Sequence, residues 1–148
     1  MDIIADLLGG ITGLASNLWP KPQEKPGLVN GRLRACPGTP NCVCSESADP
    51  LDRIEPLTFQ GAPETAWETL RIVVTDLGGT VREEEKDYLW TTFQVPVLGF
   101  TDDVEFRLDA SNRTIHVRSA SRLGYSDLGV NRGRVEQLRT AFGRAGHH

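Results

Sequence analysis

Residues 103–120 read DVEFRLDASNRTIHVRSA, and this stretch decides the fold. In residues 103–108 the apolar side chains alternate with charged ones, and residues 114–120 repeat the alternation. A period of two is typical of a strand that buries one of its faces. The polar residues between the two strands predict a hairpin, in which Phe106 lies opposite Val117 on the core side.

The other side of this hairpin is charged. The same register predicts that Glu105 lies opposite Arg118 and that Arg107 lies opposite His116. A guanidinium group beside a carboxylate favours its charged form, so Arg118 is expected to hold Glu105 ionised rather than poised for proton transfer. We expect this polar face of the sheet to carry any ligand site.

Apolar periodicity predicts further elements on either side of the hairpin. Strands are expected at residues 54–59, 80–84 and 88–95, whereas the turn-forming residues of 36–50 predict a loop. One helix is expected between Pro63 and the paired glycines at 78–79, and another near the C-terminus. Their apolar stripes are Ala66, Trp67, Leu70, Val74 and Leu77, and Val135, Leu138, Ala141 and Phe142.

This order of elements, β-α-β-β-β-β-α, predicts the fold class. It indicates an α+β domain with an antiparallel sheet of about five strands and helices packed on one face. Such an arrangement buries every apolar stripe and leaves the opposite sheet face partly polar.

Residues 1–19 are predicted to form an amphipathic helix that precedes the domain. Apolar residues recur every three or four positions, but three glycines each weaken the helix by up to about 1 kcal/mol relative to alanine. Such a helix needs a surface to dock on, either on a partner or on its own domain. The proline-containing residues 20–32 are predicted to be a linker, and residues 33–148 a single domain. The expected docking stripe is Ile4, Leu7, Leu8, Ile11, Leu14, Leu18 and Trp19.

The composition of the 148-residue chain excludes several classes of function. A formal net charge of -4 argues against nucleic-acid binding, which requires a basic surface. No apolar run is long enough to span a membrane, and the acidic start of the chain lacks the positive charge of a secretory signal. We therefore expect no transmembrane segment and a location on the cytoplasmic side or in an organelle stroma, with peripheral membrane association as an option.

Three cysteines, Cys36, Cys42 and Cys44, are spaced C-x5-C-x-C. A zinc site would need a fourth ligand, and no histidine lies near them in the sequence, so we expect no metal. A disulfide between Cys36 and Cys42 is geometrically possible, and buried thiols or a redox-responsive loop are the alternatives.

A group of charged and polar residues in and after the hairpin is the best candidate for a ligand site. Carboxylates beside guanidinium groups either fix a fold or orient a polar ligand, and both readings stay open here. The sequence shows no complete set of catalytic residues, because Ser119, Ser121 and Ser126 have no evident general base as a partner. The candidate ligand-binding residues are Glu105, Arg118, Arg122, Asp127, Asn131 and Arg132.

Three segments carry a resemblance to a known family. They are Cys36-Pro37 with Pro40-Asn41-Cys42-Val43; Gly99-Phe100 with Asp102-Asp103-Val104-Glu105-Phe106; and Arg118-Ser119-Ala120-Ser121-Arg122 with Gly124-Tyr125-Ser126-Asp127, Gly129 and Asn131-Arg132. Over about residues 33–142 the chain resembles the domain of unknown function 1499 family. The resemblance implies no activity or cofactor. It implies an origin in bacteria or in photosynthetic lineages, and it sets Cys44 apart, because members usually have serine there.

Two functions are consistent with these features. The first is a non-catalytic accessory protein that docks on a protein partner, such as a membrane-associated assembly, through its N-terminal helix. The alternative is a small enzyme or carrier that binds an anionic or polar metabolite at the Arg/Asp/Glu face. Neither hypothesis requires a cofactor or nucleic acid.

Overall fold

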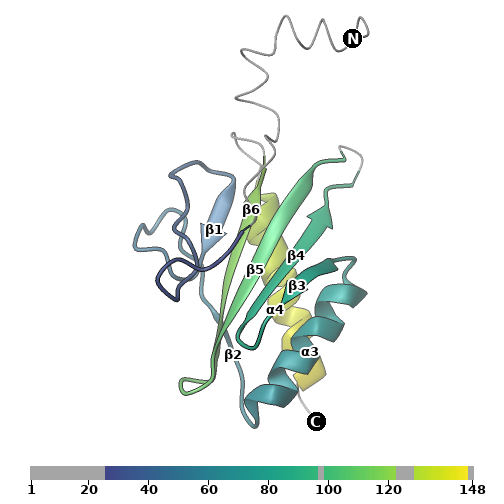
Figure 1. Ribbon diagram of the computed structural model, residues 1–148. Helices are drawn as coiled ribbons and strands as arrows, with labels where there is room; N and C mark the ends of the chain where they lie inside the picture. Colours follow the sequence, from purple (N-terminus) through teal and green to yellow (C-terminus); the bar gives the residue numbers. More distant parts are fainter. Residues whose placement is uncertain (1–25, 97–98, 123–128, 147–148) are drawn as a thin grey trace, which may run out of the picture.

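A computed structural model describes residues 26–96, 99–122 and 129–146 (Figure 1). Within these ranges an antiparallel sheet has the strand order β1-β6-β5-β4-β3, with β2 also paired to β6. Two helices pack on one face of this sheet, as expected for the α+β class. The elements are β1 (Cys42–Cys44), β2 (Leu57–Thr58), α3 (Pro63–Asp76), β3 (Thr80–Glu84), β4 (Tyr88–Gln94), β5 (Thr101–Asp109), β6 (Thr114–Ser121) and α4 (Val130–Gly146).

The hairpin of β5 and β6 has the register that its alternation predicts. Phe106 pairs with Val117, and on the other side Glu105 pairs with Arg118. Arg107 likewise pairs with His116. Because side chains alternate between the two sides of a strand, this register fixes which residues face the helices.

We call the sheet face that packs against α3 and α4 the helix face. Phe106 and Leu89 of the sheet are fully buried there, together with Leu70 of α3 and Leu138 of α4. Each such side chain stabilises the fold by about 1.5 to 3 kcal/mol relative to full exposure. The packing also leaves no room for a side chain at Gly79, between α3 and β3, because a Cβ there would lie 2.5 Å from the Phe93 ring.

The sheet has one strand more than the sequence predicts, because part of the expected loop 36–50 is β1. Its residues 42–44 pair with β6 residues 118–120, far along the chain. A three-residue strand is too short to show alternation, and its pairing partner is not local, so no sequence pattern reveals it. The expected strand at 54–59 is reduced to β2, which makes the observed order β-β-α-β-β-β-β-α.

The predicted N-terminal helix, residues 1–19, lies outside the described residues, as does the linker up to residue 25. The described chain begins with a short turn in which Val29 and Arg32 bond to each other through their backbones. From there residues 33–36 pass over the sheet face that α3 and α4 leave uncovered, which we call the coil face. No helix in the described ranges is long and apolar enough to cross a membrane.

Candidate functional site

The coil face carries a second, smaller buried cluster. Leu33 packs there against Cys44 of β1 and Tyr88 of β4, and all three side chains are at most 5% exposed. Two charged residues are buried beside them: Glu105 of β5 is fully buried and Arg118 of β6 is 8% exposed. A face that holds ionised groups out of water must pair them or shift their protonation, so their contacts decide what this face can do.

Glu105 has a hydrogen-bond partner for each of its carboxylate oxygens. The Tyr88 hydroxyl donates to Oε2 at 2.7 Å, and Arg118 Nη1 donates to Oε1 at a longer 3.4 Å. Burial nevertheless raises the pKa of Glu105, with the Tyr88 hydrogen bond and the charges of Arg118 and Arg34 acting in the opposite direction. Arg118 thus acts on Glu105 in the expected direction, while the loss of hydration acts against it and gives the pKa its net rise.

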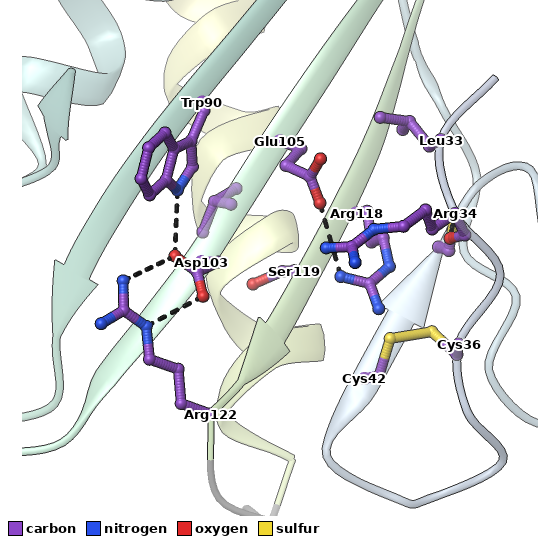
Figure 2. Close-up of polar contacts among 12 residues, drawn as sticks. Leu33, Arg34, Cys36, Cys42, Trp90, Asp103, Glu105, Arg118, Ser119 and Arg122 are labelled. Carbon is purple, nitrogen blue, oxygen red and sulfur yellow. Dashed lines mark hydrogen bonds and ion pairs between the residues drawn. A yellow bond between two sulfur atoms is a disulfide. The ribbon is translucent and has the colours of Figure 1, made fainter. Parts of the chain in front are cut away.

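Arg34 is the residue of this cluster that sequence analysis missed. Figure 2 shows its guanidinium group beside that of Arg118, both near Glu105. Its charge acts on Glu105 and on Tyr88, yet in the described part of the chain no ion pair of Arg34 lies within the usual 4.0 Å. The buried Nε atoms of both Arg34 and Arg118 lack hydrogen-bond partners. Both guanidinium groups thus lie near Glu105, but only Arg118 bonds to it, and one buried donor of each arginine is left without a partner.

The neighbouring charges on the coil face are paired. Arg122 donates to both oxygens of Asp103, each at 3.0 Å, and Trp90 Nε1 donates to Oδ1 at 2.9 Å (Figure 2). Arg107 makes a similar two-point contact with Glu46, at 2.9 and 2.6 Å. These bidentate pairs are stable arrangements that need no ligand. They flank the Arg34–Arg118 group on the same face.

Asn131, a predicted ligand-binding residue, lies on the helix face. Its side chain is buried and donates to the Asn41 carbonyl and to Ser121 Oγ, both at 3.1 Å. Its oxygen accepts hydrogen bonds from Ser119 and from Arg134 Nη1. These contacts join the start of α4 to β6, on the opposite face of the sheet from Glu105.

The remaining predicted site residues are placed elsewhere. Arg132 donates to the carbonyls of Leu51 and Arg53, both at 3.2 Å, beside a surface cavity of about 310 Å³. Asp127 lies outside the described residues. Of the six candidates, Glu105, Arg118 and Arg122 share one face, and Arg34 joins them from the coil.

The cysteines lie at one edge of the same face. Cys36 and Cys42 form a disulfide, while Cys44 is a buried free thiol whose pKa is raised by burial. Its Sγ donates to the Arg34 carbonyl at 3.6 Å. Across the described ranges no three metal-binding side chains come together.

A serine–histidine contact also escaped sequence analysis, because its partners are far apart in the chain. Ser45 Oγ lies 3.0 Å from His116 Nδ1, and burial lowers the pKa of His116. The same hydroxyl oxygen accepts the Val117 amide at 2.9 Å, while the Ser45 amide donates to the Val117 carbonyl. Ser45 thus extends the pairing of β1 with β6, which is an architectural role.

Comparison with known proteins places the chain in a family. A search of curated proteins finds no match. The family model described as Protein of unknown function (DUF1499) matches residues 32–142, which include every described strand. The chain therefore belongs to the DUF1499 family.

Proposed function

We propose that this domain is a non-catalytic binding module that holds an anionic group, a carboxylate or a phosphate, at Arg34 and Arg118. The observation that carries the proposal is the surplus of buried donors: the Nε atoms of both arginines lack partners among the described residues, and Glu105 bonds to Arg118 but not to Arg34. An arginine fork matches the oxygens of an anion in two-point contact.

The chemistry of the coil face favours binding over catalysis. Glu105 is fully buried and is engaged by Tyr88 and Arg118, so its carboxyl group supports the arginines rather than facing a substrate. Asp103 is held by Arg122 and Trp90. A binding role requires only that Arg34, which is half-buried, can reach the ligand from the coil.

The test is a titration of the full chain with inorganic phosphate and with malonate at low ionic strength, followed by NMR chemical shifts of arginine side chains. We expect shifts at Arg34 and Arg118 with either or both anions. Arg34→Gln should weaken binding by about tenfold to a hundredfold, since a hydrogen bond to a charged group contributes about 1.5 to 3 kcal/mol. Arg71→Gln, on the exposed side of α3, is the matched control and should bind normally.

Stability without ligand separates this role from an architectural one. A guanidinium group whose buried donor is unsatisfied is costly, so Arg34→Gln should leave the free energy of unfolding unchanged or raise it. Binding that is insensitive to Arg34→Gln would refute the proposal. A large loss of stability on this substitution would assign Arg34 to the fold instead.

We also propose that residues 1–19 dock the protein on a partner, as their sequence pattern suggests. The support is the apolar stripe from Ile4 to Trp19, interrupted by glycines that leave the helix weak on its own. Leu8→Glu with Ile11→Glu should abolish recovery of the partner from the native source. Thr12→Glu, on the polar side of the helix, should not. Equal recovery with all variants would refute docking through the stripe.

A further inference from the structure

We infer that the Cys36–Cys42 disulfide regulates the proposed anion site, by holding Arg34 over the coil face when oxidised and releasing it when reduced. The inference rests on the proposed function. It starts from the position of Arg34, which belongs to no strand or helix and lies two residues before Cys36. The backbone of residues 33–36 must therefore be fixed by other contacts.

The segment is anchored at two points. At one end the Leu33 amide donates to Glu46 Oε2 at 2.8 Å, and the Leu33 side chain is buried against Cys44 and Tyr88. At the other end Cys36 is bonded to Cys42, which belongs to β1 and pairs with β6. Arg34 lies between these anchors, and its carbonyl accepts a long 3.6 Å contact from Cys44. The disulfide is thus the covalent part of the second anchor, beside this weak contact and the packing of Cys36 against the Leu33 cluster.

The disulfide is also next to the groups that it would control. Figure 2 shows it close to the guanidinium groups of Arg34 and Arg118. Residues 37–41, which it closes into a loop, contain two prolines and Gly38 at a φ of +88°, a conformation that favours glycine. This loop carries no strand or helix, so without the disulfide nothing in its secondary structure would hold Cys36 beside β1.

The redox step needs a dithiol reductant. A thiolate of the dithiol attacks one sulfur of the disulfide, and the other cysteine leaves as a thiol. The second thiol of the reductant then attacks the mixed disulfide, which frees the remaining cysteine and leaves an oxidised, cyclic reductant. Two electrons and two protons pass from the dithiol to Cys36 and Cys42. Cys44 takes no part, since burial raises the pKa of its thiol.

Reduction should weaken anion binding without unfolding the domain. The main core lies on the helix face and contains neither Cys36 nor Cys42. The Leu33 anchor also persists, so the expected change is local to residues 34–41. Because Arg34 would lose its fixed position, the affinity for malonate should fall by about tenfold to a hundredfold, as for Arg34→Gln.

The experiment measures malonate affinity by calorimetry for the full chain, oxidised or treated with dithiothreitol. The wild type should bind more weakly after treatment. The double variant Cys36→Ser with Cys42→Ser should bind malonate with the affinity of the reduced wild type. Dithiothreitol should not change that affinity. Circular dichroism should show that all forms remain folded. Equal affinity of the oxidised and reduced wild type would refute regulation by the disulfide. If Arg34→Gln still loses binding in that case, the proposed anion site itself stands.

A second readout does not depend on any ligand. Amide hydrogen exchange of residues 33–36 should become faster on reduction in the wild type and should already be fast in the double variant. Exchange in β5 should not change. If residues 33–36 exchange at the same rate in both redox states, the proposed release of this segment on reduction is refuted. If they respond but no anion binds in either state, regulation of an anion site is refuted together with the proposed function.

Discussion

The two faces of the sheet are buried by different means. On the helix face, α3 and α4 cover a continuous apolar layer, and the polar residue Asn131 has partners for both its oxygen and its nitrogen. On the coil face, a short segment covers Glu105 and Arg118, and donors of two arginines remain unbonded. The helix face is buried mainly by apolar side chains, and its buried carboxylate, Asp102, is paired with Arg134 Nη1 at 2.7 Å. The coil face accepts buried charge at a cost in stability, and such a cost is typical of a functional surface.

The largest expected effect tests the helix face. Phe106→Ala should lower the free energy of unfolding by about 3 to 5 kcal/mol, because the ring is fully buried and its removal leaves a cavity. Chemical denaturation measures this change. Leu33→Ala, on the coil face, is the comparison and should cost less, because a coil can settle into the space more easily than a packed helix. Equal losses would mean that the coil face is as tightly packed as the helix face.

The next effect concerns the disulfide on the coil face. Replacing Cys36 and Cys42 together by serine should lower the free energy of unfolding by about 2 to 3 kcal/mol, since the bond restricts a short loop in the unfolded chain. Thermal unfolding of the oxidised wild type and of the variant measures the difference. Dithiothreitol should bring the wild type to the level of the variant and should leave the variant unchanged. A variant as stable as the oxidised protein would contradict this account.

A smaller effect is expected at Gly79, on the helix face. Gly79→Ala should destabilise the domain by about 1 to 3 kcal/mol, because the new methyl group would meet both Phe93 and Val74 at under 3 Å. Gly133→Ala in α4 is the control, since nothing lies within 4 Å of its added Cβ. It should stabilise the helix by up to about 1 kcal/mol. A neutral Gly79→Ala would show that the helix face yields to extra volume.

The sequence predicts the helix face better than the coil face, for a physical reason. Alternation in β5 and β6 sets their register and correctly pairs Glu105 with Arg118, because each strand repeats its own pattern. The strand β1 has only three residues and pairs with a distant strand, so it leaves no such pattern. Arg34 lies in a coil whose path depends on Cys36, and no local rule places its side chain near Glu105.

Asn131, at the start of α4, does not lie on the same sheet face as the other predicted site residues Glu105, Arg118 and Arg122. The sequence identifies Asn131 as polar and close to a helix terminus, but it does not show towards which face of the sheet the first turn points. The contacts of Asn131 with Asn41 and Ser121 place it on the helix face. The protonation of Glu105 also depends on the coil that covers it. Strand periodicity therefore cannot predict the protonation of a residue that is buried by a segment distant in the sequence.

The smallest expected effect is on the pH dependence of stability, which compares the two faces without removing a packed group. Burial raises the pKa of Glu105, so the folded protein keeps a proton that the unfolded chain loses above about pH 4.3. The resulting stability is complete below that pH and is lost as the pH rises through the folded pKa. Glu105→Gln removes this titration. Denaturation at several pH values should therefore show the wild type losing stability relative to the variant as the pH rises.

Other titrating groups do not obscure this difference. Burial disfavours the charged form of Glu46, but the hydrogen bonds from Arg107 and from the Leu33 amide outweigh it and lower the pKa. Burial lowers the pKa of His116. Both groups add stability that is lost as the pH falls, the opposite sign to Glu105, and both are present in the wild type and in Glu105→Gln. If the difference instead rises with pH, the arginines hold Glu105 ionised, and the ion pair with Arg118 outweighs the loss of hydration.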